Sequence, residues 1–174
     1  MEEQRRETWA DLCAHIGEQR LPRWGELPDM ELYMDLVLSL IERYLGSYPG
    51  FDRKGLTASM VNNYVKLGVM PPPVKKRYTR VHLAHLVMIC LLKSSLPIER
   101  IKSLLLRSIR DGGEAEVYDD FCAAFEASVK RAAATPAAEP GLPDVYAAAL
   151  RAQAEQAVAL RLCETMLNEK TGTK

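Results

Sequence analysis

Apolar residues recur at helical spacing along nearly the whole of this 174-residue chain, and this periodicity constrains its fold more than any other feature. Residues three and four positions apart share one face of a helix, whereas a half-buried strand alternates apolar and polar residues. No alternating run is long enough to mark a substantial sheet. The sequence therefore predicts an all-α fold with one short β-turn element.

Prolines, glycines and capping residues divide this pattern into helices. Asp29, Thr57 and Thr79 stand where an N-cap would begin a helix, and the proline run at 71–73 forbids any helix through it. The helix after Thr79 is apolar nearly all round, so it should be the most buried. The last two helices should pair as an antiparallel hairpin across a Pro/Ala linker, residues 135–143. We expect helices over residues 7–18, 29–45, 57–67, 80–93, 97–111, 114–134 and 144–168.

The chain is formally neutral, with 23 Lys and Arg residues against 23 Asp and Glu residues, but its charge is unevenly distributed. Residues 53–110 hold 12 basic residues and one acidic residue, Glu99, for a net charge of +11. The flanks compensate with −6 over residues 1–52 and −5 over residues 111–174. Such a basic segment favours a polyanionic partner such as nucleic acid. The alternative is that acidic flanking helices dock on a basic middle.

Length and composition indicate one folded domain, with or without an appendage. With 48% hydrophobic residues, 174 residues are enough to bury a core. The longest apolar run, residues 83–92, is far shorter than a bilayer span and contains His85. The charged residues at positions 2–6 are followed by no apolar signal region. We therefore expect a cytoplasmic protein with no membrane partner.

Four cysteines are widely spaced, at Cys13, Cys90, Cys122 and Cys163. They form no CxxC pair and no Cys/His pair of the kind that closes a zinc site. Each lies on the apolar face of a predicted helix, so we expect most of them to be small core residues. A redox-sensing thiol is the alternative, but no basic residue is evidently placed to activate one.

Candidates for catalysis or metal binding are few. His82 and His85 are three positions apart on one predicted helix, but no third ligand accompanies them, so we expect partly exposed or hydrogen-bonded core side chains. The chain has no defensible Ser/His/Asp set, glycine-rich phosphate loop or paired carboxylates for acid–base chemistry. The sequence therefore predicts no catalytic residue, no metal site and no cofactor.

The most informative motif lies inside the basic segment. The predicted helix over 57–67 ends in Tyr64-Val65-Lys66-Leu67-Gly68, and after the prolines comes Lys75-Lys76-Arg77-Tyr78-Thr79. This order resembles the MerR-like winged helix-turn-helix, in which a recognition helix ending in Tyr-x-basic-x-Gly leads through prolines to a wing ending in Arg-Tyr-Ser/Thr and then to a helix pair. Residues 29–110 resemble more closely still an uncharacterised bacterial family that carries this module and has no known function.

Some features depart from the MerR-like pattern. The preceding helix, residues 29–45, is long and separated by a loop, the wing over 73–78 is short, and no long coiled-coil dimerisation helix is evident after Arg110. The resemblance implies three segments: an N-terminal helical extension over 1–28, a MerR-like helix-turn-helix domain over 29–110, and a C-terminal helical region over 111–174.

The predicted recognition helix should turn Ala58, Val61 and Val65 inward and its polar residues outward. Asparagine can read an adenine edge in the major groove, and lysine and arginine bind phosphates. The alternative is that exposed Asn and Lys are ordinary surface residues. The expected DNA-contacting residues are Lys54, Thr57, Ser59, Asn62, Asn63, Tyr64, Lys66, Lys75, Lys76, Arg77, Tyr78 and Arg80.

These observations predict a sequence-specific DNA-binding transcriptional regulator whose partner is double-stranded DNA. Regulation is what the resemblance implies, and the charge pattern supports DNA binding independently. We expect a homodimer, and this interpretation is compatible with an effector of unknown identity. The rival interpretation is a protein–protein interaction module built on a degenerate helix-turn-helix, whose basic face binds an acidic partner. An enzyme is a distant third and would require a deep polar pocket.

Overall fold

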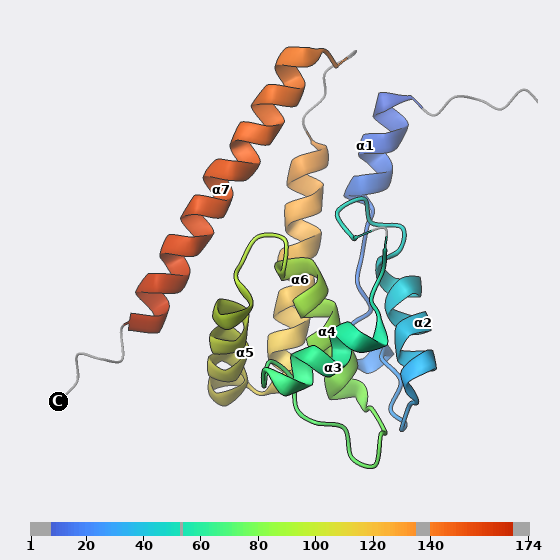
Figure 1. The fold of residues 1–174 in the computed structure, drawn as a ribbon. Coiled ribbons are helices and arrows are strands. Elements are labelled where there is room, and N and C mark those ends of the chain that lie inside the picture. The colour runs from blue at the N-terminus through green and yellow to red at the C-terminus, as the bar shows by residue number, and fades with distance from the viewer. Residues whose placement is uncertain (1–7, 53, 135–139, 169–174) are drawn as a thin grey trace, which may run out of the picture.

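The computed structural model describes residues 8–52, 54–134 and 140–168, in which the chain forms seven α-helices, one 3-10 helix and no strand (Figure 1). The predicted all-α fold is confirmed. Residue 7 of the first predicted helix and residues 135–139 of the predicted linker lie outside these ranges. The elements are α1 (Trp9–Gly17), the 3-10 helix η1 (Trp24–Glu26), α2 (Met34–Leu45), α3 (Ala58–Lys66), α4 (Arg80–Leu92), α5 (Ile98–Gly112), α6 (Glu114–Ala133) and α7 (Leu142–Asn168).

Helix α4 is the centre of the core. Every residue from His82 to Cys90 is buried, because apolar side chains occupy most faces of this helix. Helices α2, α5 and α6 pack around it. Leu83, Leu86 and Ile89 are fully buried, and burial of each such side chain contributes about 1.5–3 kcal/mol before entropy is subtracted. The predicted central position of this helix is confirmed.

Helix α2 begins later than predicted. Met34 is its first residue, and Tyr33 occupies the N-cap position without a side-chain hydrogen bond, so the N-cap assigned to Asp29 is wrong. The reason is a non-local pairing. Leu32 and Tyr78 exchange both of their backbone hydrogen bonds, at 2.8 and 2.9 Å, in an isolated antiparallel bridge. This bridge holds the chain extended up to Tyr33.

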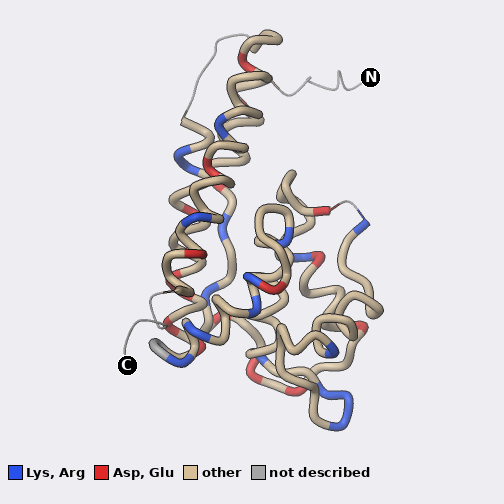
Figure 2. The backbone as a smooth tube through the Cα atoms, turned by 60° about the vertical axis from the view of Figure 1, so that its left-hand side comes forward, with Lys and Arg blue, Asp and Glu red and all other residues tan. Residues whose placement is uncertain are grey.

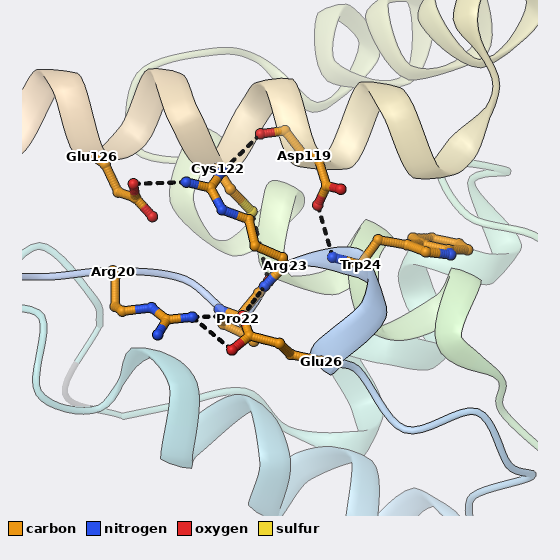
Figure 3. A network of polar contacts seen from close by, with 8 residues as sticks. All are labelled: Arg20, Pro22, Arg23, Trp24, Glu26, Asp119, Cys122 and Glu126. Carbon is orange, nitrogen blue, oxygen red and sulfur yellow. Dashed lines mark hydrogen bonds and ion pairs between the residues drawn. The ribbon is translucent and has the colours of Figure 1, made fainter.

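The segment between α1 and α2 is fastened to α6 (Figure 3). The guanidinium of Arg23 donates to the backbone oxygen of Asp119 at 2.9 Å and forms an ion pair with Glu126 at 2.7 Å. The backbone nitrogen of Trp24 donates to the Asp119 carboxylate at 2.7 Å. Leu21 lies beside these contacts and is 1% exposed. The segment between α1 and α2 therefore packs into the core and does not lie loosely on the surface.

One hydrophobic cluster draws on all three segments of the predicted division. Leu21 and Leu27 come from residues 1–28, Ile101 from residues 29–110, and Tyr118 and Cys163 from residues 111–174. Each of these side chains is at most 6% exposed. The terminal segments therefore help to stabilise the part of the chain that carries the basic motif.

Helix α7 is long and mostly exposed. It runs back antiparallel to α6 along one edge of the molecule, at the left of Figure 1, but it packs mainly against α5. Cys163 is buried, whereas every residue from Gly141 to Val158 is exposed. The helix starts at Leu142 rather than at Asp144, whose carboxylate accepts a hydrogen bond from the backbone nitrogen of Gly141 at 2.8 Å. Neither α7 nor any other described helix combines the length and hydrophobicity needed to cross a bilayer.

The cysteines are free thiols, as their spacing suggests. Cys90, Cys122 and Cys163 are buried, in agreement with the prediction of core positions, and Cys13 is half-buried. Burial raises the pKa of the Cys90 and Cys122 thiols to about 11. This shift is opposite to that of a reactive thiolate and argues against redox sensing at these two positions.

Candidate nucleic-acid interface

Helix α3 has one buried face and one polar face. Thr57 is its N-cap, and the Thr57 hydroxyl accepts a hydrogen bond from the backbone nitrogen of Met60 at 3.3 Å. Val61 is fully buried and Val65 is half-buried, so the predicted inner face is confirmed at these positions. The outer face, also as predicted, exposes Ser59, Asn62, Asn63 and Lys66.

The carboxyl end of α3 is held by a residue of α5. The ammonium group of Lys102 donates to the backbone oxygen of Leu67, the C-cap residue, at 2.8 Å. Gly68 follows with φ +68°, a conformation that side chains rarely adopt, and a Cβ there would lie 3.1 Å from Lys102 Nζ. This contact spans 35 positions, so the motif alone gives no signal for it.

After the three prolines the chain makes a tight four-residue turn, Val74–Arg77, which we call the basic turn. The backbone nitrogen of Arg77 donates to the Val74 oxygen at 2.8 Å, which closes the turn. Lys75 and Lys76 form its tip and are exposed. Figures 1 and 2 show the loop between α3 and α4 projecting from the body of the molecule, with its basic residues at the tip.

The chain is not extended at the tip of the basic turn. Lys75 has φ +50° and Lys76 has φ +61°, both in the left-handed region. Positive φ at both central residues is typical of a type I′ turn, which Asn and Gly normally occupy. Two lysines in this conformation store strain, of about 1–3 kcal/mol each. Only Lys75 and Lys76 lie between the hydrogen-bonded residues Val74 and Arg77, so the turn is short.

Two aromatic residues anchor the basic turn. The guanidinium of Arg77 stacks on the ring of Tyr33, 3.7 Å from its centroid. Tyr78 continues the chain into the core through its bridge to Leu32 and is 4% exposed. Stacking fixes the Arg77 guanidinium plane while leaving the side chain half-exposed. The cationic tip therefore stands on a rigid base.

Two of the predicted contact residues are core residues instead. Tyr64 is 7% exposed on the inner face of α3, and Tyr78 is 4% exposed. Burial raises the pKa of both phenols. Their rings pack beneath α3 and the basic turn, because burial of the large apolar surface of an aromatic ring stabilises the fold. Neither ring lies on the surface that a nucleic acid would meet.

Arg80 and Lys54 differ from the rest of the predicted set. The Arg80 side chain is 20% exposed, forms an ion pair with Asp29 at 3.6 Å, and lies 5.7 Å from the Trp24 ring centroid. It therefore ties the N-terminal segment to the start of α4. Lys54 is exposed, but it lies in the loop after the carboxyl end of α2, whereas the basic turn adjoins the amino end of α2. Lys54 is thus separated from the basic turn.

Three lysines of this surface are not paired with the described parts of the acidic flanks. Lys66, Lys75 and Lys76 form no ion pair with any described residue. The Arg80–Asp29 pair does join the basic segment to an acidic flank, as the docking alternative requires. This pair accounts for Arg80, but no described acidic residue forms an ion pair with the tip of the basic turn or with Lys66 at the end of α3.

The two histidines of α4 are buried, each 5% exposed. His82 Nδ1 accepts a hydrogen bond from the Thr79 backbone nitrogen at 2.9 Å and so caps the helix. His82 Nε2 and both ring nitrogens of His85 have no hydrogen-bond partner among the described residues. Burial lowers the pKa of His82, and burial together with His82 lowers the pKa of His85 to about 4. Both rings are therefore neutral at physiological pH.

Two further observations concern other kinds of site among the described residues. No set of three or more His, Cys, Asp or Glu side chains that could hold a metal ion occurs in the described ranges. A cleft of about 730 Å³ lies between α1, the end of α6 and the start of α7, with a mainly apolar lining that includes Trp9, Ile16, Leu142 and Val145. This cleft does not include residues of α3 or of the basic turn.

The structure thus brings Ser59, Asn62, Asn63 and Lys66 together on one helix face and sets Lys75, Lys76 and Arg77 on the loop that follows it. No curated protein and no solved structure matches the chain. A model of a family described as a domain of unknown function, DUF1836, matches residues 22–121. Since this match covers more than half of the chain, the protein belongs to the DUF1836 family.

Proposed function

We propose that this protein is a sequence-specific DNA-binding transcriptional regulator that acts in the cytoplasm as a homodimer. The observation that carries the proposal is the strained basic turn on the loop that follows α3, whose outer face is polar. Lys75 and Lys76 are held in an unfavourable backbone conformation, and they are exposed and form no ion pair with a described residue. Strain that the fold maintains at an exposed site is typical of functional surfaces.

The order of elements supports a winged helix-turn-helix interpretation. Helix α3 would be the recognition helix, the basic turn would be the wing, and α4 with α5 would be the helix pair that supports them. A nine-residue helix is long enough to present its outer face to a major groove. The wing would then lie against the phosphate backbone beside that groove.

The exposed residues divide into two kinds of contact. Lysine and arginine at the end of α3 and in the basic turn would bind phosphates and set affinity. Asn62 and Asn63 would contact base edges, because an amide can donate to and accept from adenine at once. Ser59 and Thr57 lie at the amino end of α3, where hydroxyls and backbone nitrogens suit a phosphate. Tyr64 and Tyr78 are left out because they are buried.

Salt dependence is the direct test of DNA binding. If a dimer neutralises about eight phosphates, the logarithm of the association constant should fall with the logarithm of salt concentration at a slope of about −7. Fluorescence anisotropy with labelled random duplex measures this slope. A flat salt response, or no binding at low salt, would reject DNA as the partner and favour the protein-interaction alternative.

Matched variants test the two kinds of contact. Replacing Lys75 and Lys76 by Ala removes four lysines from a dimer, so it should weaken binding to every duplex and make the salt slope shallower by about 4. Lys130→Ala, an exposed lysine on α6, is the control and should change neither quantity. Asn62→Ala or Asn63→Ala should instead reduce discrimination among duplexes selected from a random pool. Equal losses on all duplexes for both sets of variants would contradict the assignment.

A further inference from the structure

Helix α7 carries an apolar residue at every fourth position over most of its length, and the row is exposed. Its large side chains are between 46% and 70% exposed. We call this row the α7 ridge, because residues four apart form a continuous ridge on a helix surface. It consists of Leu142, Tyr146, Leu150, Ala154, Val158, Leu162 and Met166.

The packing of this chain does not cover the α7 ridge. The side of α7 that meets the rest of the molecule is marked by Cys163, which is buried, by Ala159 and Leu160, which pack on the hydrophobic cluster, and by Gln156, which donates to the Ser95 oxygen at 3.1 Å. Every ridge residue from Leu142 to Leu162 is exposed. A continuous row of exposed apolar side chains usually marks an interface in a soluble protein.

The α7 ridge is symmetric about its middle residue. Ala154 lies at the centre, with Leu150 and Val158 four positions to either side and Tyr146 and Leu162 eight positions to either side. In an antiparallel pair of α7 helices related by a two-fold axis at Ala154, each of these residues would meet its counterpart of the opposite arm. A two-fold interface requires this kind of self-complementary surface.

Shape and charge beside the ridge fit the same arrangement. A shallow cleft of about 330 Å³ is lined by Val158, Leu162 and their neighbours, where Leu150 and Tyr146 of a second copy would insert. Arg151 and Glu155 flank Ala154, and neither forms an ion pair with a described residue. Across an antiparallel two-fold pair, Arg151 of each copy faces the region of Glu155 of the other.

We propose that the α7 ridge is the surface through which two copies of this chain associate, about a two-fold axis at Ala154. Ridges of residues four apart interdigitate when helices cross at about 50°, so the contact would centre on the stretch from Tyr146 to Leu162. Ala154 at the crossing allows close approach of the two backbones. In Figure 1, α7 lies at the left and the loop that carries the basic turn lies at the bottom.

The first test is the mass of the full chain in solution, measured by light scattering on a gel-filtration column without DNA. The wild-type chain should have twice the monomer mass, and Leu150→Glu with Val158→Glu should halve it. Met30→Glu is the matched control, since Met30 is 63% exposed on another part of the surface, and it should leave the dimer intact. Far-UV circular dichroism should show unchanged helix content, because both ridge positions are exposed.

The second test uses the symmetry itself. In a Cys13→Ala background, Ala154→Cys would place two thiols at the two-fold axis, close enough to form an intermolecular disulfide under mild oxidation. Gln153→Cys, one position away on another side of the helix, should cross-link at least fivefold less. A wild-type monomer at 100 µM or a dimer that survives the double glutamate variant would overturn the proposal, and so would equal cross-linking at positions 153 and 154. These outcomes are independent of DNA binding.

Discussion

At the scale of single residues, the tip of the basic turn places two positive charges at the surface at a cost in backbone strain. A type I′ turn places both central residues at positive φ, where the Cβ of lysine crowds the backbone, whereas glycine has no Cβ and the short side chain of asparagine can hydrogen-bond locally. The fold nevertheless keeps Lys75 at φ +50° and Lys76 at φ +61°. No described residue forms an ion pair with either of these two ammonium groups.

We therefore predict that Lys75→Asn with Lys76→Gly makes the protein more stable while it weakens DNA binding. Relief of strain should raise the free energy of unfolding by about 1 kcal/mol, after the added freedom of glycine in the unfolded chain is subtracted. Urea unfolding measures the gain. The double alanine variant removes the charges but keeps the strain, so it should show no such gain. A loss of stability in the Asn-Gly variant would mean that the lysines stabilise the turn.

His85 leads to a prediction about pH. Its folded-state pKa is about 4, below the ordinary value of 6.5, so the unfolded chain binds this proton more readily than the native chain. Stability should therefore be complete above about pH 6.5 and fall as the pH drops toward 4, by up to about 3 kcal/mol. His82, also lowered by burial, acts in the same direction.

Replacement of His85 by leucine should flatten this dependence. The variant keeps the volume of the side chain near that of the imidazole and has no proton to bind, so its urea midpoint should change less between pH 7 and pH 4.5 than that of the wild type. Exposed His15, replaced by leucine, is the control and should leave the slope unchanged. If His85→Leu kept the full acid slope, other groups would be responsible for it.

At the scale of elements, the capping chemistry read from the sequence is accurate where it is local. Thr57 caps α3 as predicted, with its hydroxyl bound to the Met60 nitrogen, and Thr79 begins α4 with His82 as its partner. Asp29 fails as a cap because Leu32 pairs with Tyr78, 46 positions away, and that pairing keeps the chain extended. A capping preference of about 1 kcal/mol cannot compete with a buried bridge of two hydrogen bonds.

The end of α3 provides a prediction at this scale. Lys102→Met removes the 2.8 Å hydrogen bond to the Leu67 oxygen and keeps most of the aliphatic stem. We expect a loss of about 1 kcal/mol, since the C-cap oxygen then depends on water. Lys130→Met on the exposed surface of α6 should change stability by less than about 0.5 kcal/mol. Urea midpoints of the two variants decide, and equal midpoints would mean that the α5–α3 contact contributes nothing.

At the scale of the whole molecule, the spacing of apolar residues predicts the all-α fold class. It does not predict which helices pack against each other. The sequence shows that α4 is apolar on most faces, which is sufficient to place it at the centre. It does not show that Arg23 meets Asp119 and Glu126, about 100 positions away, or that α7 packs on α5 rather than on α6. The candidate site follows the same rule: the exposed face of α3 was predictable, and the burial of Tyr78 depended on its distant bridge to Leu32.

We call the polar contacts that join Arg23 and Trp24 to α6 the clasp. They lead to a prediction about the stability of the whole protein. Arg23→Met leaves the partly buried Glu126 carboxylate and the Asp119 oxygen without their donor, which should lower the free energy of unfolding by about 1–2 kcal/mol. Arg20→Met removes an exposed, solvent-screened pair with Glu26, so it should leave the melting temperature nearly unchanged. Thermal unfolding of the two proteins side by side measures the difference, and similar melting temperatures would argue against the clasp.

The bridge between Leu32 and Tyr78 has a consequence for how the molecule opens. Two amides, isolated among loop residues, are bound to each other's carbonyl groups at the point where the N-terminal segment meets the chain leading into α4. In deuterated solvent these two amides should exchange far more slowly than those of Glu31 and Lys76 beside them. A rise in their exchange rate, with α4 still protected, would report that the N-terminal segment had detached while the remainder of the protein stayed folded.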